Sequence, residues 1–171
     1  MEREQSMQTR LLYEKTLSEE RMYQAHALMV PEFISRGGNI RDIEIDELFD
    51  LARIHGELWT ASDNGQVLAS FTLLTLTGNR SRWGYLNHGI VAPEKRHQGG
   101  MLMETLLRSC LNKQRNMNAY FTISTAQSIF SRLGFIHTDI ATLEQIDPAI
   151  AEITKHKVRP NTHAVILSKI L

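Results

Sequence analysis

The stretch from Trp83 to Asn112 reads WGYLNHGIVAPEKRHQGGMLMETLLRSCLN, and it decides the fold. Its first part, Tyr85–Val91, is mostly apolar or β-favouring and is closed by a proline, which predicts a strand. The next part, Pro93–Gly100, places cations beside two glycines and predicts a turn. From Leu102 onward, apolar residues recur at helical spacing, which predicts a helix with one buried face. We therefore expect a strand, a basic turn and an amphipathic helix, in that order.

A helix that begins directly after such a turn can bind an anion. Its first backbone N–H groups have no partner within the helix, and the helix macrodipole favours negative charge there. Glycines let a phosphate approach the backbone, and Lys95 and Arg96 add positive charge. A pyrophosphate group is the natural occupant, and an ordinary turn with solvated cations is the alternative. The turn matches neither the dinucleotide-binding pattern nor the P-loop pattern.

The stretch Val91–Met101 resembles the acyl-CoA pyrophosphate loop of the GNAT family of N-acetyltransferases. In that loop an Arg or Gln is followed, after two residues, by Gly, any residue, and Gly or Ala. Arg96 and Gly99 fit this pattern, whereas Met101 departs from it. In a second alignment, Gly99 is the last glycine and the loop is two residues short. The sequence leaves both registers open.

A second block supports this resemblance. Ala126–Phe135 is similar to the family block that is usually read as A-x-x-F-Y-E-x-x-G-F. Phe130 stands where many members carry a tyrosine that protonates the leaving CoA thiolate, and phenylalanine cannot donate a proton. Tyr85 stands where some members place a glutamate general base. The nearest subfamily is the acetyltransferase domain of N-acetylglutamate synthases, which also tends to carry phenylalanine in this block.

The rest of the chain predicts the following elements, given by residue numbers. They are a strand at 8–13, a helix from the capping box at 16–19 to about 35 that Pro31 kinks or ends, a helix at 43–54 closed by Gly56, strands at 57–62 and 66–76 joined by a tight turn at 63–65, a strand at 119–123, a helix at 125–133 capped by Ser124, a strand at 136–142, an ambiguous polar stretch at 147–161, and a strand at 163–170. The expected fold is a mixed α/β fold with a mostly antiparallel sheet flanked by helices, of the GNAT acyl-CoA N-acyltransferase type, in one domain over 1–171.

The composition argues against several classes of binding partner. The 171 residues carry 19 basic and 19 acidic side chains, which argues against a nucleic-acid binder. There is no signal peptide at the start and no apolar run of transmembrane length, so we expect a cytoplasmic protein without a membrane partner. The seven histidines show no ligand spacing with carboxylates, so no metal is expected. Cys110, the one cysteine, is expected to be a small buried apolar residue. A homodimer is left open.

The resemblance also assigns a site. The expected co-substrate is acetyl-CoA, and the predicted binding residues are Gly89, Ile90, Val91, Arg96, His97, Gln98, Gly99, Gly100, Met101 and Phe130. His88 is the best general base candidate, because histidine titrates near neutrality. It alternates with Tyr85, so it lies on the opposite face of the strand unless a bulge intervenes. The alternative is a buried histidine with a structural role. Tyr85 as a hydroxyl relay and Ser124 as a donor to sulfur complete the catalytic candidates.

Together these features predict an acetyl-CoA-dependent N-acetyltransferase that acts on a small amine or amino acid. A CoA-binding module that has lost its chemistry is one alternative, favoured by Phe130 and Met101. A protein or peptide N-acetyltransferase is another. The cationic run 155–159 could hold the carboxylate of an amino-acid acceptor, or it could be a solvated loop.

Overall fold

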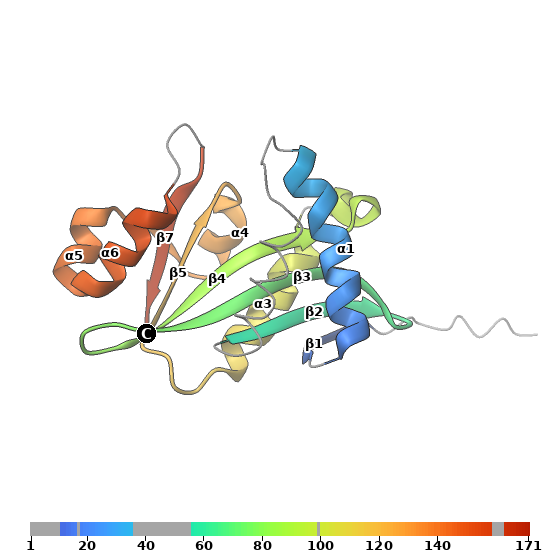
Figure 1. The fold of residues 1–171 in the computed structure, drawn as a ribbon, viewed down its shortest axis with the longest axis horizontal. Coiled ribbons are helices and arrows are strands. Elements are labelled where there is room, and N and C mark those ends of the chain that lie inside the picture. Colours follow the sequence, from blue (N-terminus) through green and yellow to red (C-terminus); the bar gives the residue numbers. More distant parts are fainter. Residues whose placement is uncertain (1–10, 17, 36–55, 99, 159–162) are drawn as a thin grey trace, which may run out of the picture.

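The computed structural model describes residues 11–16, 18–35, 56–98, 100–158 and 163–171 (Figure 1). The predicted helix at 43–54 lies outside these residues. The elements are β1 (Leu12–Thr16), α1 (Glu19–Ser35), β2 (Gly56–Asp63), β3 (Gln66–Thr77), β4 (Arg82–Val91), the 3-10 helix η1 (Pro93–Gln98), α3 (Met101–Lys113), β5 (Ala119–Ser124), α4 (Gln127–Arg132), β6 (Ile136–His137), α5 (Ile140–Ile146), α6 (Pro148–Lys157) and β7 (Val165–Ile170). The strand, turn and helix predicted from the central stretch are confirmed as β4, η1 and α3.

The strands of the described residues form one seven-stranded sheet in the order β1-β2-β3-β4-β5-β7-β6. Neighbouring strands are antiparallel except for β4 and β5, which are parallel. The predicted mixed, mostly antiparallel sheet flanked by helices is thus confirmed. Asn64 and Gly65 have φ of 48° and 82°, the left-handed values that a two-residue hairpin of type I′ requires, so the predicted turn between β2 and β3 is also confirmed.

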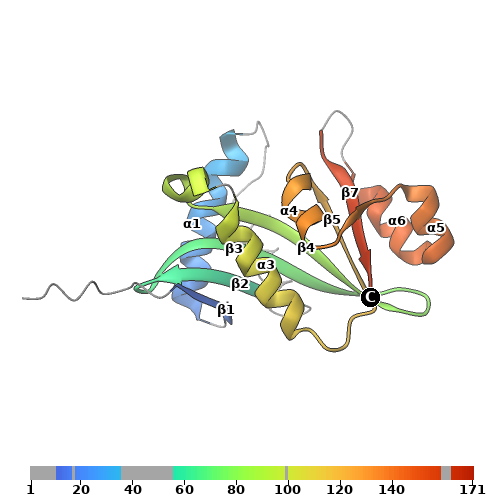
Figure 2. The ribbon, with the colours of Figure 1, turned by 180° about the vertical axis from the view of Figure 1, so that it is seen from behind.

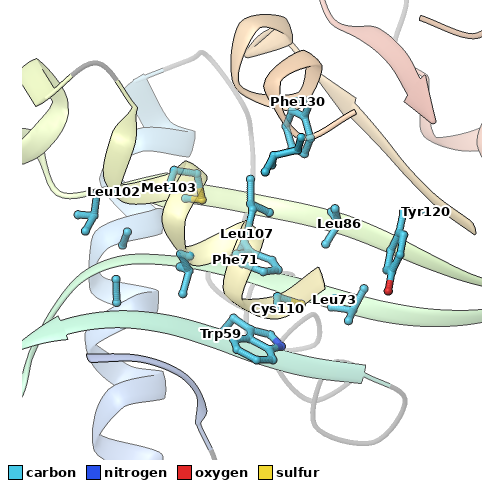
Figure 3. Packing of buried hydrophobic residues seen from close by; sticks show 14 of the residues in the cluster. Trp59, Phe71, Leu73, Leu86, Leu102, Met103, Leu107, Cys110, Tyr120 and Phe130 are labelled. Carbon is cyan, nitrogen blue, oxygen red and sulfur yellow. The ribbon is translucent and has the colours of Figure 1, made fainter. Parts of the chain in front are cut away.

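One face of the sheet packs against α3. Side chains from five strands, β2, β3, β4, β5 and β7, form a single buried cluster with the apolar face of this helix (Figure 3). Trp59, Phe71 and Leu86 come from the strands, and Leu107 and Cys110 come from α3. Cys110 is fully buried, as its place in the helical pattern predicts. This packing fixes the position of the N-terminus of α3 relative to the end of β4.

The other face carries α1 and the pair α5 and α6. Leu58 pairs with Thr72, and Thr72 pairs with Asn87, so these three residues share one face. Leu58 packs with Ala25 of α1. Tyr85, two residues before Asn87, packs with residues of α5 and α6. The two views in Figures 1 and 2 show α1 and α3 on opposite sides of the sheet.

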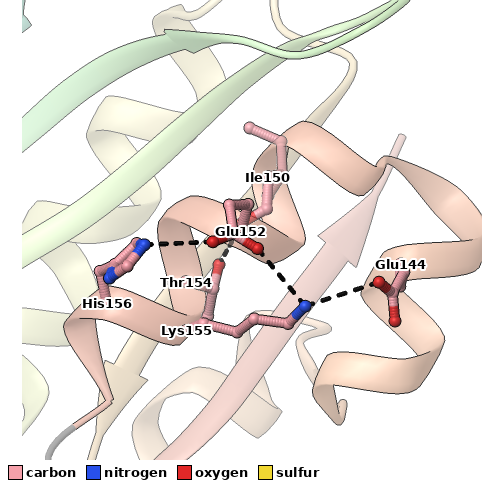
Figure 4. Close-up of polar contacts among 6 residues, drawn as sticks. All are labelled: Glu144, Ile150, Glu152, Thr154, Lys155 and His156. Carbon is pink, nitrogen blue, oxygen red and sulfur yellow. Dashed lines mark hydrogen bonds and ion pairs between the residues drawn. The ribbon is translucent and has the colours of Figure 1, made fainter.

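Helix α5 replaces the end of the predicted strand at 136–142, and α6 occupies most of the ambiguous stretch at 147–161. Asp139 caps α5 by accepting a hydrogen bond from the Thr142 backbone at 2.7 Å, so the strand expected at 136–142 is wrong beyond the two residues of β6. Asp147 caps α6, and Pro148 occupies its first turn, where proline is favoured. Lys155 of α6 reaches Glu144 of α5, which ties the two helices together on the surface (Figure 4).

Two further expectations differ from the structure. Helix α1 runs through Pro31 to Ser35, the expected last residue, so of the two outcomes expected at Pro31, a kink or the end of the helix, the end is excluded. Pro31 lies close to the C-terminal end, where the loss of one backbone hydrogen bond affects few following residues. Ser124 does not cap α4. The N-cap is Ala126, and its backbone N–H donates to the Ser124 hydroxyl at 3.0 Å.

Candidate acetyl-CoA and acceptor site

Strand β4 carries an extra residue opposite β3. Thr72 pairs with Asn87 and Ser70 pairs with Ile90, so one residue of β3 spans two of β4. His88 is one of these two and has φ of 53°. A positive φ is uncommon outside glycine, and a bulge of this kind re-aims a side chain. The structure therefore contains the bulge that His88 needs in order to lie on the same face of β4 as Tyr85.

The side chains of Asn87, His88 and Thr72 form a closed set of hydrogen bonds. Asn87 Nδ2 lies 3.1 Å from His88 Nε2, and His88 Nδ1 lies 3.3 Å from Thr72 Oγ1. Thr72 Oγ1 in turn donates to the Asn87 carbonyl oxygen at 3.2 Å. An amide nitrogen can only donate, so Nε2 accepts and Nδ1 carries the proton of the neutral ring. This arrangement holds the imidazole in one tautomer on the face that α1 and α6 share.

The pKa of His88 is lowered to about 4, first by burial and then by the positive charge of Lys157. The expectation that His88 titrates near neutrality is therefore wrong. The physical reason is that a desolvated imidazole close to a cation disfavours a second positive charge. At pH 7 the ring is neutral, and a conjugate acid with a pKa of about 4 makes it a weak base.

Strands β4 and β5 separate beyond Tyr85. Their parallel pairing joins Trp83–Tyr85 to the first three residues of β5. At the next step, the Leu86 carbonyl oxygen accepts a hydrogen bond from the Thr122 hydroxyl at 2.8 Å. From there to Val91, no strand among the described residues pairs with this edge of β4, and Figure 1 shows the two strands diverging. The backbone at 89–91, predicted to hold the thioester and pantetheine, lies on the separated part of β4.

The turn after β4 ends in a left-handed residue. Gly100 is the N-cap of α3, with φ of 75° and ψ of 5°. A Cβ at this position would lie 2.6 Å from Cδ1 of Ile129, so the turn requires glycine both for its conformation and for its close packing. The first helical bond joins Glu104 N–H to the Gly100 carbonyl at 2.9 Å. The N–H groups of residues 101–103 therefore have no partner within α3.

The remaining residues of the predicted loop lie in different surroundings. Met101 is the first residue of α3, and its side chain is 69% exposed, as is expected if it does not fill the helix N-terminus. His97 is also exposed. Gly99 and the side chain of Gln98 lie outside the described residues. Because the helix begins at Met101, Gly100 rather than Gly99 is the glycine directly before it.

Arg96 uses part of its guanidinium on the protein itself. Its Nε donates to the Val91 carbonyl oxygen at 3.0 Å, and its Nη2 pairs with Glu32 of α1 at 2.8 Å. A guanidinium has five N–H donors, so these contacts leave others to bind a phosphate. Arg96 thus links the turn to α1, a contact that the sequence pattern does not indicate.

The other candidates are placed by packing. Tyr85 is buried and stacks on Phe121, with ring centroids 4.6 Å apart. Phe130 is 8% exposed and packs edge to face against Phe135 in the cluster under α3. Ser124 is half-buried at the end of β5, where its oxygen accepts from a backbone N–H and its hydroxyl hydrogen can still donate. Its role as a donor to sulfur stays a prediction.

Sequence reasoning missed two members of the polar set at the bulge. Thr72 gave no signal, because a threonine in a β-favouring strand is ordinary. The dipeptide Asn87-His88 within an apolar strand was the available sign of an irregularity.

The fold is that of the GNAT acyl-CoA N-acyltransferases. An acetyltransferase from Streptococcus agalactiae matches with a TM-score of 0.62 at 15% identity, over 94% of this chain and 98% of that one. A GNAT family N-acetyltransferase from Escherichia coli in complex with CoA matches with a TM-score of 0.61 at 19% identity, over 95% and 82% of the two chains.

The N-acetylglutamate synthase from Neisseria gonorrhoeae, complexed with CoA and N-acetyl-glutamate, matches with a TM-score of 0.64 at 19% identity. The match covers 95% of this chain and 35% of that one, so the chain spans about a third of that enzyme. No family model and no curated protein sequence matches the chain.

The described residues form no helix that is both long and apolar enough to cross a membrane. They also bring together no group of three or more histidine, cysteine, aspartate or glutamate side chains that could hold a metal ion.

Proposed function

We propose that this protein is an acetyl-CoA-dependent N-acetyltransferase that acts on a small amine or amino acid. The observation that carries the proposal is the separation of β4 and β5 beside the bulge at His88. Beyond Tyr85, one backbone edge of β4 has no neighbouring strand among the described residues. This edge lies next to the polar side chains of Thr72, Asn87 and His88, where we expect the acceptor. The acetyltransferase structures with the same fold, two of them with CoA bound, support the proposal.

The proposal assigns a place to the pyrophosphate and to the pantetheine arm of acetyl-CoA, which supplies the activated acetyl group. The N–H groups of residues 101–103, which have no partner within α3, favour the pyrophosphate, and Gly100 adds no side chain of its own there. The backbone at 89–91 is suited to hold the pantetheine and the thioester, because hydrogen-bond donors on a fixed strand stabilise developing negative charge on the carbonyl oxygen.

The reaction joins the amine nitrogen to the acetyl carbon and breaks the carbon–sulfur bond. The amine must lose one proton, and the sulfur leaves as a thiolate that takes up a proton. A thiol of pKa about 8.5 is a tolerable leaving group without a full proton donor. His88 and its partners orient the neutral amine by hydrogen bonds, and alignment of this kind contributes several kcal/mol, on the order of 7–11 in ideal cases. Weak general acid and base groups predict slow turnover.

Release of free thiol from acetyl-CoA tests the proposal. We expect at least one class among amino acids, polyamines and peptide N-termini to raise thiol release above the rate without amine. A mass spectrum of the product should show one added acetyl group. If no amine raises the rate while calorimetry still detects CoA binding, the chain is a CoA-binding module without this activity and the proposed function is wrong.

A further inference from the structure

Lys157 differs from the other cations at the end of α6. Lys155 lies 3.5 Å from Glu144 and 3.4 Å from Glu152, and His156 lies 3.1 Å from Glu152 (Figure 4). Lys155 thus forms ion pairs with two surface carboxylates, and His156 contacts one of the same carboxylates. Lys157 is half-buried and forms no ion pair with any carboxylate in the part of the chain that the structure describes. Among the described residues, the charge of Lys157 therefore has no carboxylate partner, unlike the charge of Lys155.

The surroundings of Lys157 offset only part of the free energy that burying its charge costs. Its Nζ lies 4.9 Å from the ring centroid of Tyr85, a cation–π contact. The C-terminal end of α6 also favours a positive charge, but Lys155 supplies one there from the surface. Burial still lowers the pKa of Lys157 from its ordinary value. A partly buried cation of this kind is stabilised by an anion that binds beside it.

The position of Lys157 favours a carboxylate of the acceptor over the pyrophosphate of CoA as this anion. Tyr85 packs with α5 and α6, whereas α3 packs on the opposite face of the sheet. The pyrophosphate expected at the N-terminus of α3 is thus on the other side from Lys157. Tyr85 shares its face of β4 with Asn87, so Lys157, which lies over Tyr85, is on the side of the sheet that carries the polar set. The charge of Lys157 also lowers the pKa of His88. An ammonium group is a compact point charge that suits one carboxylate.

We propose that Lys157 binds the carboxylate of the acceptor, so that the chain prefers amino acids over amines that lack an acid group. The proposal rests on the proposed function, because it names the acceptor of that same reaction. In this arrangement the carboxylate sits beside Lys157, and the amino group faces His88 and the separated edge of β4.

The test compares acceptors that differ only in the acid group: glycine, alanine and leucine, each alongside its α-amide. We expect Lys157→Met to lower kcat/KM for the acids by about tenfold or more, and to change kcat/KM for the amides by less than threefold. Lys157→Arg should retain part of the preference. Lys155→Met is the matched control, because it removes a cation from the same helix end without facing Tyr85. Equal losses for acids and amides in Lys157→Met would overturn the proposal.

Binding without turnover separates the two proposals. Calorimetry with N-acetyl-glutamate in the presence of CoA should show binding that Lys157→Met weakens about tenfold and Lys155→Met leaves unchanged. If thiol release fails for every amine and this binding is found, the proposed acetyl transfer is wrong and the carboxylate site stands. If thiol release occurs and amides are used as well as acids by the wild type, the carboxylate site is wrong and the acetyl transfer stands.

Discussion

Asn87 and His88 are neighbours in the chain, yet Nδ2 of Asn87 lies 3.1 Å from Nε2 of His88. In a regular strand these side chains would point to opposite faces. They meet because the bulge gives His88 a left-handed backbone conformation. The imidazole lone pair is therefore occupied by an amide, which suits a group that positions a substrate better than one that removes protons freely.

Replacing this amide by a carboxylate should change the titration of His88. Asn87→Asp places a negative charge at Nε2, which favours the imidazolium, so the pKa of His88 should rise from about 4 by at least one unit. The His88 ring resonances, followed by NMR against pH, measure the shift. Asn116→Asp, the same change at an exposed position, is the control. An unchanged titration in Asn87→Asp would contradict the contact between the two side chains.

The low pKa of His88 also predicts a pH dependence of stability. The unfolded chain binds a proton at this histidine near pH 6.5, and the folded chain binds it near 4. The free energy of unfolding should therefore fall as the pH is lowered from 6.5 to 4, by about 3 kcal/mol for this group, and His88 should cause no further change below that range. Denaturant titrations of the wild type and His88→Gln at pH 7 and pH 4 isolate the effect. Equal losses in both proteins would rule it out.

Much of the fold could be predicted because its signals are local. The turn at 63–65 needs left-handed residues, and Asn-Gly supplies them. The buried face of α3 follows from apolar spacing alone. The N-cap at Asp139 is also a local signal, because aspartate is favoured directly before the first residue of a helix. It was missed because the apolar residues after Ile136 were interpreted as a continuing strand.

The site could be predicted only in part because its decisive contacts are long-range. The tautomer and pKa of His88 depend on Thr72 of another strand and Lys157 of a later helix. Arg96 pairs with Glu32, which lies 64 positions earlier in the chain. No local pattern encodes these distances. The run at 155–159 was recognised as cationic, but only packing distinguishes the half-buried Lys157 from the surface-paired Lys155.

Asp147 should be a major determinant of stability. It is buried and accepts hydrogen bonds from Asn79 N–H at 3.1 Å and Ser81 Oγ at 2.8 Å, besides capping α6. Asp147→Ala leaves these donors without a partner, so it should lower the free energy of unfolding by roughly 2–4 kcal/mol. Chemical denaturation measures the loss. Asp139→Ala, which removes an exposed cap, should cost only about 1 kcal/mol, and similar losses in the two variants would contradict this ranking.

The left-handed Gly100 should tolerate no side chain. Gly100→Ala adds a Cβ at a φ of 75° and 2.6 Å from Ile129 Cδ1, so it should cost about 1–3 kcal/mol of stability. Ile129→Val removes that carbon, and the double variant should recover the part of the loss that comes from the clash. Gly89→Ala is the control, because its Cβ would meet only Met103 Cε at an ordinary 3.6 Å. Equal losses at both glycines would refute the packing argument.

Arg96 should affect CoA affinity through the donors that Glu32 and Val91 leave free. Arg96→Glu places a carboxylate beside the expected pyrophosphate site and should weaken CoA binding at least tenfold by calorimetry. Arg80→Glu makes the same charge change in the β3–β4 turn and should bind CoA as the wild type does. Glu32→Gln removes the competing anion, so CoA binding should become tighter. If Arg96→Glu loses stability and keeps its affinity for CoA, the arginine only ties the turn to α1, and the N-terminus of α3 binds the phosphates without it.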